Sequence, residues 1–247
     1  MASLYLAEPG AFDGVAVGAR AAIEGEEARH AASVARVRVG ESLAFADGAG
    51  VLVRGAVVAA SPERVEIEVD EIAREPVPRP ELRLAQALAK GDRDELAIQA
   101  ATELGVDGVI PWAAERSVVR WQGAKVDRGV ERWRAIVREA SKQSIRARVP
   151  AVAPPASTAE LARGVRPDHA LLVLEPTAER PLATLALPEV AAITLVVGPE
   201  GGIAPREREV LAAAGAVEVR LGPGVLRTST AGPAALAALA VRLGRWA

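Results

Sequence analysis

A change in the pattern of apolar residues about a third of the way along the chain limits its fold more than any other feature. Three prolines (Pro76, Pro78 and Pro80) make the segment "REPVPRPE" a stiff, extended linker. Before it, apolar and polar residues alternate one by one, as in "RVEIEVDEI", which is the period of a half-buried strand. After it, apolar strands alternate with helical segments. The sequence therefore predicts a β-rich domain at 1–75 and an α/β domain at 81–247.

The first domain is predicted to be a small β-barrel. The stretch "SLAFADGAGVLVRGAVV" contains two strands on either side of the turn at Asp47 and Gly48, a common hairpin signal. The stretch "EEARHAASVARVRVG" has apolar residues at helical spacing and predicts a short helix that ends at Gly40.

The second domain is predicted to be a parallel sheet with helices on both faces. The expected strands are "LRLAQAL", "GVIPW", "HALLVLEP", "AAITLVVG" and "AVEVRL". The expected helices are "DRDELAIQAATELGV" with Asp92 as its N-cap, "KVDRGVERWRAIVREASKQS", "PREREVLAAAG" and the closing "STAGPAALAALAVRLGRW". The fold class is therefore α/β, with a small β domain in front.

Composition excludes several chemistries. The 247 residues include no cysteine, which rules out disulfides, cysteine nucleophiles and thiolate metal sites and fits a reducing cytoplasm. Two histidines far apart in sequence make a histidine metal site unexpected. The chain shows no signal-peptide pattern and no apolar run long enough to cross a bilayer.

Charge is unevenly distributed along the chain. Residues 1–75 carry a net charge of −6, whereas residues 76–148 carry +4, so the middle of the chain is the expected surface for a polyanion. A predicted helix over about 125–146 carries a stripe of basic residues, spaced four positions apart, opposite a stripe of apolar residues. Its members are Arg134, Arg138, Lys142 and Arg146. The stripe is either a solvated helix face or a contact for RNA phosphates.

A glycine-rich turn in "LVVGPEGGIAPRE" (195–207) joins a predicted strand to a predicted helix. It lacks the Lys-Ser/Thr of a phosphate-binding P-loop and the GxGxxG spacing of dinucleotide sites. Glu200 would repel phosphates, so a neutral or positively charged ligand suits the turn better. Glycines there let the backbone approach a ligand closely. The alternative is a plain tight turn before a helix that begins at Pro205.

Two further strand ends carry similar loops. In "VEVRLGPGVLRTSTAGPAALAAL" (217–239), Arg227 lies beside a Gly-Pro-Gly loop, and the Ser and Thr residues after it are possible N-caps. In "LLVLEPTAERP" (171–181), a strand ends at Glu175. Ligand sites of α/β proteins form at the carboxyl ends of parallel strands, so we expect the three loops to face one pocket.

These motifs together resemble the ribosomal RNA small subunit methyltransferase E family of the SPOUT superfamily. "GPEGG" is followed about 20 residues later by "LGPGVLRTSTA", and the segments 90–121 and 132–152 resemble the family's two helical segments. The first domain resembles its PUA-like, RNA-binding barrel, so the similarity covers nearly the whole chain.

The resemblance implies a deep trefoil knot at the C-terminal end of the second domain, whose loops bind S-adenosylmethionine largely through backbone groups. It implies a homodimer through the knot region. It also implies methylation of the N3 atom of a uridine in small-subunit (16S) ribosomal RNA. The weak net charge favours an assembled particle as the substrate, and the composition favours the cytoplasm, without a metal or a membrane.

The resemblance also assigns roles to residues. Arg227 is the catalytic candidate, as a stabiliser of negative charge on the uracil, and no general base is named. The basic stripe is assigned to RNA. The cofactor is expected to contact Leu174, Glu175, Pro176, Gly198, Glu200, Gly201, Gly202, Leu221, Gly222, Leu226, Thr228 and Thr230.

The chain departs from the family pattern in two places. Ser229 stands where the family usually has glutamate, and the barrel segment "HAASVARVR" keeps only His30 and Arg36 as a trace of the family's usual "HVLR"-like segment. His30 and His169 are interpreted as structural. The alternatives are a SPOUT methyltransferase acting on transfer RNA or a ribose 2′-hydroxyl, and a non-catalytic RNA-binding assembly factor.

Overall fold

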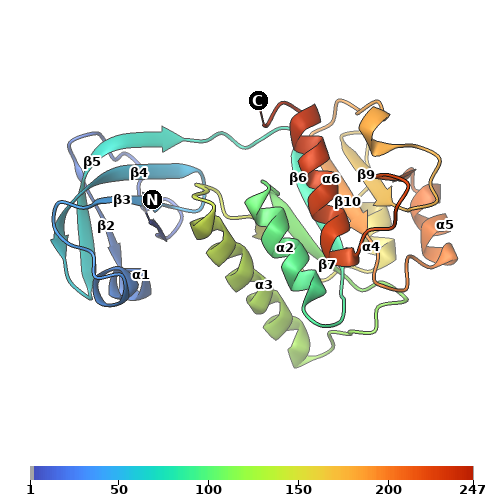
Figure 1. Cartoon of the computed structure of the whole chain (residues 1–247), viewed down its shortest axis with the longest axis horizontal. Helices are drawn as coiled ribbons and strands as arrows, with labels where there is room; N and C mark the ends of the chain where they lie inside the picture. The colour runs from blue at the N-terminus through green and yellow to red at the C-terminus, as the bar shows by residue number, and fades with distance from the viewer. Residues whose placement is uncertain (1–2, 247) are drawn as a thin grey trace. The chain divides into compact units, whose positions relative to one another are not determined.

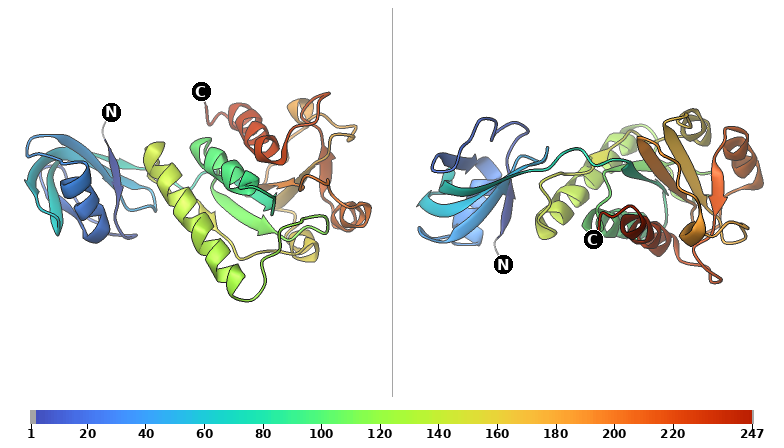
Figure 2. Two further views of the ribbon diagram at one scale, coloured as in Figure 1. Left: turned by 60° about the horizontal axis from the view of Figure 1, so that its bottom comes forward. Right: turned by 90° about the horizontal axis from the view of Figure 1, so that it is seen from above.

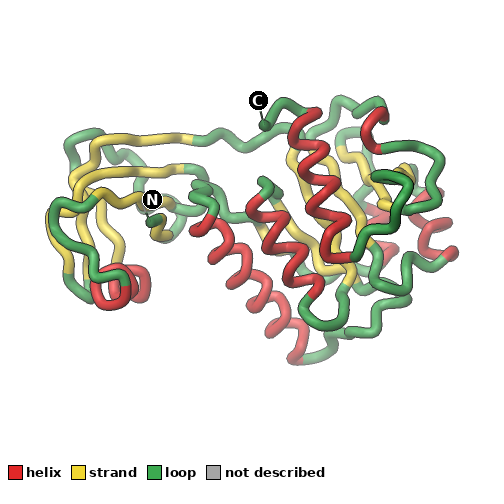
Figure 3. The backbone as a smooth tube through the Cα atoms, in the orientation of Figure 1, coloured by secondary structure: helices red, strands yellow, loops and turns green. Residues whose placement is uncertain are grey.

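The computed structural model describes residues 3–246 and divides into two compact units. The first contains the residues up to Val77 together with Ser141–Val149, and the second contains Pro78–Ala140 and the residues from Pro150 on. Each unit is built around its own sheet, as the strands drawn in yellow in Figure 3 show.

The first unit is a five-stranded sheet in the order β1-β3-β4-β5-β2. Its core contains every phenylalanine and the one tyrosine of the chain: Phe12 stacks on Phe45, and Tyr5 meets Phe45 edge to face. Its elements are β1 (Leu4–Leu6), β2 (Arg20–Glu24), α1 (Gly25–Arg29), the π-helix η1 (His30–Val34), β3 (Ser42–Ala46), β4 (Val51–Ala60) and β5 (Arg64–Arg74).

The predicted hairpin at Asp47 is confirmed. β3 and β4 pair antiparallel, and the Asp47 carboxylate accepts hydrogen bonds from the Ala49 and Val51 amides at 2.8 and 2.9 Å. The predicted helix ends earlier than expected. Arg36 already turns the chain with a left-handed φ of 56°, so the expectation of an end at Gly40 was wrong.

Closure of the first sheet into a barrel remains a proposal, because its outer strands β1 and β2 are not paired with each other in the described residues. The segment Ser141–Val149 also belongs to this unit, which the sequence did not predict. The Val149 amide donates to the Gly48 carbonyl at 3.0 Å, and the Arg148 guanidinium donates to the carbonyls of Glu75 and Pro76.

The second unit contains a six-stranded sheet in the order β11-β9-β10-β6-β7-β8, and every pair is parallel, as predicted. The strands are β6 (Glu81–Ala87), β7 (Gly108–Trp112), β8 (Ala151–Val152), β9 (His169–Leu174), β10 (Ala192–Val197) and β11 (Val217–Val219). The helices are α2 (Arg93–Glu103), α3 (Ala124–Gln143), α4 (Thr158–Arg163), the 3-10 helix η2 (Leu182–Thr184), α5 (Pro205–Ala213) and α6 (Thr228–Arg242).

Helices cover both faces of this sheet, with α2 and α6 on one face and α4 and α5 on the other (Figures 1 and 2). Leu161 of α4 and Leu211 of α5 pack on Ala85 and Val196. On the opposite face α6 approaches so closely that a Cβ at Gly232 would lie 2.9 Å from a Leu84 methyl. This close approach brings the first turn of α6 against the ends of β6 and β10.

Asp92 is the N-cap residue of α2, as predicted, but its φ of 58° is left-handed and its side chain makes no capping hydrogen bond. Instead, the buried Asp94 carboxylate accepts from the Glu95 amide at 3.0 Å, and burial raises the pKa of Asp94. The short elements β1, β2, β8, α4 and η2 were not predicted, because two to six residues give too little periodicity to detect.

Candidate functional site

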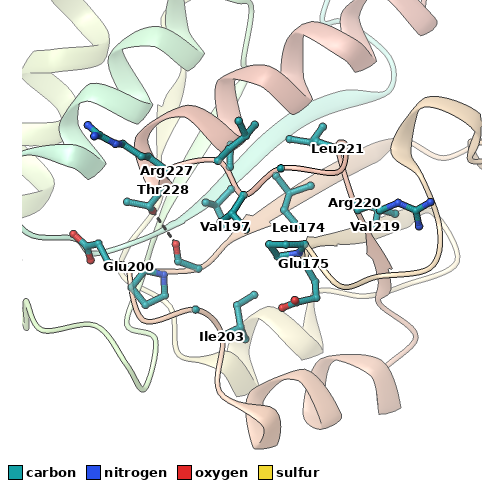
Figure 4. A pocket seen from close by; sticks show the side chains of 18 of the residues that line it. Leu174, Glu175, Val197, Glu200, Ile203, Val219, Arg220, Leu221, Arg227 and Thr228 are labelled. Atoms are coloured by element: carbon teal, nitrogen blue, oxygen red, sulfur yellow. Dashed lines mark hydrogen bonds between the residues drawn. The ribbon is translucent and has the colours of Figure 1, made fainter.

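A pocket of about 410 Å³ opens at the carboxyl ends of β9, β10 and β11, beside the first turn of α6 (Figure 4). Its walls are mostly apolar side chains and glycine backbone. Of the predicted cofactor contacts, ten line it: Leu174, Glu175, Pro176, Gly198, Glu200, Gly202, Leu221, Gly222, Leu226 and Thr228. Arg227 and Arg93 also line it. The three loops expected to share one pocket do so.

Two predicted contacts lie outside the lining. Gly201 faces away, because a Cβ there would meet the Arg116 side chain at 3.4 Å, and the Arg116 guanidinium donates to the Gly201 carbonyl at 3.0 Å. Thr230 lies within the first turn of α6 and is exposed, and its amide donates to the Arg227 carbonyl at 2.8 Å.

The first glycine loop, residues 198–204, is closely packed. A Cβ at Gly198 would lie 2.7 Å from Cγ1 of Ile203, so this position has room only for glycine. The Gly202 amide donates to the Pro199 carbonyl at 2.9 Å, and Gly202 has a φ of 70°. At the end of the loop, the Ala204 amide donates to the Glu207 carboxylate at 3.2 Å, where α5 begins with Pro205.

Glu200, the acidic residue of this loop, is engaged by the protein itself. Its Oε1 accepts from the Arg93 guanidinium at 2.8 Å and from the Lys90 amide at 3.1 Å. Burial on its own would raise the pKa of Glu200, but the hydrogen bonds from its own amide, from Arg93 and from Lys90 outweigh burial and hold the pKa below its usual range. The charge of Glu200 is thus matched by Arg93, and the carboxylate lies at the rim of the pocket (Figure 4).

Glu175, the second carboxylate of the pocket, is held in a similar way. Its Oε1 accepts from the amide and hydroxyl of Thr177 at 3.1 and 2.8 Å, and its Oε2 lies 3.7 Å from Arg208. Arg208 also makes a bidentate pair with Glu218 at 2.6 Å, which lowers the pKa of Glu218. Both pocket carboxylates are thus held in place by contacts within the protein.

The second glycine loop, residues 221–227, contrasts with the first. Among the described residues, 221–226 take part in no hydrogen bond, and Val225 is 79% exposed. Arg227, the predicted catalytic residue, is the N-cap of α6. Its guanidinium has no hydrogen-bond or carboxylate partner among the described residues. A free cation at a helix N-terminus, where the helix dipole is positive, makes a favourable place for an anion.

The residues after Arg227 do not cap α6 with their side chains, contrary to one alternative. The Thr228 hydroxyl donates instead to the Gly198 carbonyl at 2.8 Å and accepts from the Gln86 amide at 2.8 Å. Ser229, at the departure from the family pattern, is half-buried in the first turn of α6. Gln86 was not predicted, although a single amide within the apolar strand "LRLAQAL" was a usable signal.

The predicted RNA-binding stripe is not uniformly exposed. Arg134 is exposed and pairs with Glu131 at 2.5 Å. Arg138 and Arg146 are half-buried. The Lys142 side chain is only 11% exposed, and its ammonium lies 3.3 Å from the carboxylate of Glu27, which is equally buried at 13%. Lys142 therefore makes a structural ion pair of the first unit.

The two histidines lie apart from the pocket. His169, on β9, is buried and its Nε2 lies 2.8 Å from the Thr194 hydroxyl. Burial and the nearby Arg83 and Arg166 lower the pKa of His169. The exposed His30 ring lies 6.0 Å from the Tyr5 ring. Within residues 3–246, no cluster of metal-ligating side chains and no helix capable of spanning a membrane is present.

Comparison with known proteins identifies both parts of the chain. Residues 75–240 match the RNA methyltransferase domain, and residues 23–70 match the RNA methyltransferase PUA domain. The solved structure of a ribosomal RNA small subunit methyltransferase E from Neisseria gonorrhoeae, bound to S-adenosyl methionine, is 27% identical. It superposes with a TM-score of 0.86 over 98% of each chain.

Two curated relatives carry the same name. The ribosomal RNA small subunit methyltransferase E of Mycobacterium bovis is 47% identical over 233 residues, which are 93% of this chain and 89% of the relative. That of Bacillus subtilis is 33% identical over 225 residues, or 88% of each chain. The chain therefore belongs to the ribosomal RNA small subunit methyltransferase E family.

Proposed function

We propose that the protein transfers a methyl group from S-adenosylmethionine to the N3 atom of a uridine in 16S ribosomal RNA. Membership of the family supports the general reaction, and the S-adenosyl methionine bound to the Neisseria relative supports the cofactor. The position on the base rests on one observation in this chain: the unpaired guanidinium of Arg227 at the pocket lining.

The pocket fits this cofactor in size and chemistry. Its volume of about 410 Å³ lies within the range of small-molecule sites. Apolar side chains such as Leu174, Val197 and Ile203 suit an adenine ring, and the glycine loops expose backbone groups to its polar edge. S-adenosylmethionine carries two positive groups and one carboxylate, and the Glu175 and Glu200 carboxylates in the pocket lining are compatible with a ligand of positive net charge.

The cofactor supplies a methyl group bonded to a positively charged sulfur. This sulfur is a good leaving group when the methyl group is transferred. The protein must present the uracil as a nucleophile, and N3 carries a proton with a pKa above neutral. A cation beside the ring lowers that pKa because it favours the anionic form. We assign this role to Arg227, whose charge adds to the positive end of the α6 dipole. The base must be turned out of its stack to reach the pocket.

RNA is proposed to contact both units. In the second unit, Arg134 and Arg138 of α3 offer charges for phosphates, and in the first unit Arg146 does so. Lys142 serves as the matched control because it is engaged with Glu27. We expect Arg134→Gln to weaken RNA binding. The slope of the logarithm of affinity against the logarithm of salt concentration should fall by about one unit, the contribution of one phosphate contact. Lys142→Gln should lower thermal stability instead. An unchanged salt dependence in Arg134→Gln would remove α3 from the RNA surface.

We further propose the knotted SPOUT topology for the C-terminal segment. The loop after β9 lies against the end of β11: the Leu182 amide donates to the Arg220 carbonyl at 2.8 Å, and the Arg220 amide donates to the Arg180 carbonyl at 2.9 Å. Arg242, near the end of α6, reaches back to the Leu182 carbonyl at 2.6 Å. These hydrogen bonds between distant segments support a threaded chain.

A homodimer, a cytoplasmic location and an assembled small-subunit particle as substrate complete the proposal. Exposed apolar side chains on α2 and α6 and at the chain end support an interface: Leu96, Val241 and Trp246 are 55%, 61% and 46% exposed. The location follows from the ribosomal substrate. Light scattering of the purified protein tests the dimer, and a monomer at working concentration would contradict it.

Methyl transfer from labelled S-adenosylmethionine tests the proposed function. We expect incorporation into small subunits that lack the modification, and less into naked 16S RNA. Incorporation into transfer RNA alone would favour the alternative substrate. Cofactor binding without incorporation into any RNA would favour a non-catalytic assembly factor, for which the serine at position 229 is the motivating observation.

A further inference from the structure

A buried amide beside the pocket has no role in the proposed reaction. Gln86 is the second-to-last residue of β6, is fully buried, and lies in register between Val197 of β10 and Pro111 of β7. Its Nε2 donates to the Thr228 hydroxyl at 2.8 Å and to the Ala87 carbonyl at 3.2 Å. Its Oε1 is buried and has no hydrogen-bond partner among the described residues.

An amide with an unpartnered oxygen is an expensive way to fill a core position. An apolar side chain of similar size would pack there without that cost. What the amide adds is its donor to Thr228. If the amide were turned over, its oxygen would face the Ala87 carbonyl, so this carbonyl, which can only accept, fixes the orientation in which Nε2 points to Thr228.

This donor determines the direction of the Thr228 hydroxyl proton. A hydroxyl has one proton and two lone pairs. Because Gln86 occupies a lone pair of Thr228, the proton is directed to the Gly198 carbonyl, 2.8 Å away. The hydrogen bonds therefore run in one direction, from Gln86 through Thr228 to Gly198, and connect β6, α6 and the end of β10.

The Gly198 carbonyl is the only polar anchor of its peptide group. The next residue is Pro199, which has no amide proton, so the peptide between them can be fixed only through its oxygen. This peptide begins the first glycine loop, and both of its residues line the pocket. A change in its orientation would move the backbone that the cofactor contacts.

We infer that Gln86 is a positioning residue, which holds the Gly198 carbonyl through the Thr228 hydroxyl and thereby sets the shape of the cofactor pocket. The inference rests on the proposed function of that pocket. It assigns the Thr228 hydroxyl to the protein's own backbone, so Thr228 shapes the pocket through its position. Neither side chain needs to touch the cofactor.

The test combines cofactor affinity with a measurement that needs no cofactor. Gln86→Leu and Thr228→Val each remove the connection at nearly constant volume, and we expect each to weaken S-adenosylmethionine binding in calorimetry by roughly tenfold, the effect of one lost hydrogen bond. The double variant should bind S-adenosylmethionine no more weakly than either single variant, because both substitutions break the same hydrogen-bonded connection. Thr228→Ser keeps the hydroxyl and should bind within about twofold of wild type.

Hydrogen exchange of the cofactor-free protein gives the second readout. The Gly202 amide, which donates to Pro199 within the loop, should exchange faster in Gln86→Leu and Thr228→Val than in wild type and Thr228→Ser. Gln99→Leu, at an exposed glutamine of α2, is the matched control and should change neither readout. Should Gln86→Leu fail to fold, Thr228→Val against Thr228→Ser gives the same contrast.

The outcomes separate this inference from the proposed function. If wild type binds S-adenosylmethionine and Thr228→Val has the same affinity and the same Gly202 exchange rate as wild type, only the positioning role is overturned. Additive losses in the double variant would also overturn it, because independent effects do not form one connection. A wild-type protein that does not bind S-adenosylmethionine would overturn the proposed function, whereas faster Gly202 exchange in the variants would still support the hydrogen-bonded connection.

Discussion

The two glycine loops of the pocket differ in how the protein holds them. The first, residues 198–204, is fixed from several directions: Thr228 holds Gly198, Arg93 holds Glu200, and Arg116 holds Gly201. The second, residues 221–227, makes no hydrogen bonds over 221–226 in the described chain. Both loops contain a Gly-Pro step and further glycine and apolar residues, so their glycine and proline content does not explain the contrast.

The difference indicates a division of labour. A loop that is fixed before binding offers a preformed surface and loses little entropy when a ligand arrives. A loop with few internal contacts opens and rearranges at low cost, which suits the entry of a ligand or a base. We therefore expect the first loop to set cofactor affinity and the second, which ends at Arg227, to act on the RNA and the chemical step.

The largest expected effect sharpens this division. Arg227→Ala should lower kcat by about a hundredfold or more, as the loss of a charge that stabilises a developing anion does. Cofactor affinity should change little, because the guanidinium is exposed and supports no other side chain in the described structure. Single-turnover kinetics and calorimetry on the same variant check both parts. A variant with weak cofactor binding and normal turnover at saturation would contradict the division.

The second largest effect is expected in the first loop. Gly198→Ala places a Cβ 2.7 Å from Ile203 Cγ1 and 3.2 Å from its amide nitrogen, so the loop must move. Overpacking of this kind costs about 1–3 kcal/mol, and we expect a cofactor Kd raised by roughly tenfold or more. Calorimetry measures the Kd, and thermal unfolding separates it from a general loss of stability.

Glu200→Gln should have a smaller effect of a few-fold on the cofactor Kd, because the Arg93 pair is partly exposed and such pairs contribute little. Glu131→Gln removes a comparable exposed pair far from the pocket loops and serves as the control. Equal effects of the two substitutions on the cofactor Kd would show that Glu200 does not fix the loop.

The lowered pKa of Glu200 adds a pH dependence with a definite sign. A carboxylate whose folded pKa lies below its unfolded value contributes fully above the unfolded value of about 4.3, and the contribution is lost as pH falls through the folded pKa. Cofactor affinity should therefore be flat from neutral pH down to about 5 and fall only in more acidic solution. In the Glu200→Gln variant, the part of this fall in cofactor affinity that is due to protonation of Glu200 should be absent.

The smallest effect is expected at Gly222 in the second loop. A Cβ there would meet nothing within 4 Å, and its φ is not left-handed, so Gly222→Ala should change the cofactor Kd less than about twofold. The substitution is the direct counterpart of Gly198→Ala. Similar losses at the two positions would remove the contrast between the loops.

The sequence predicted the order and type of the long elements well, because apolar periodicity is strong over six or more residues. β6, β10, α3 and α6 lie where their patterns indicated. It predicted the pocket from glycine loops at three strand ends, because parallel strands bring their carboxyl ends to one edge. Asp92 lies at the predicted N-cap position, but its side chain makes no capping hydrogen bond, because capping depends on the backbone angles of one residue and Asp92 is left-handed.

Pairings between distant residues were beyond reach of the sequence. The turn around Glu200 was expected to suit a neutral or positively charged ligand, and the sequence did not indicate that Arg93, 107 positions away, pairs with Glu200. Lys142 was grouped with an exposed stripe by its spacing, yet Glu27, 115 positions away, pairs with it. Local patterns predict which face of a helix is polar. They do not predict which distant carboxylate the fold brings to it.

Nucleoside analysis tests the central claim most directly. Small ribosomal subunits that lack the modification are incubated with the protein and S-adenosylmethionine, and the RNA is digested and analysed by mass spectrometry. The account predicts 3-methyluridine from the wild-type protein and at least about a hundredfold slower formation with Arg227→Ala. A product methylated on the ribose 2′-hydroxyl, or 3-methyluridine formed equally fast by the variant, would contradict it.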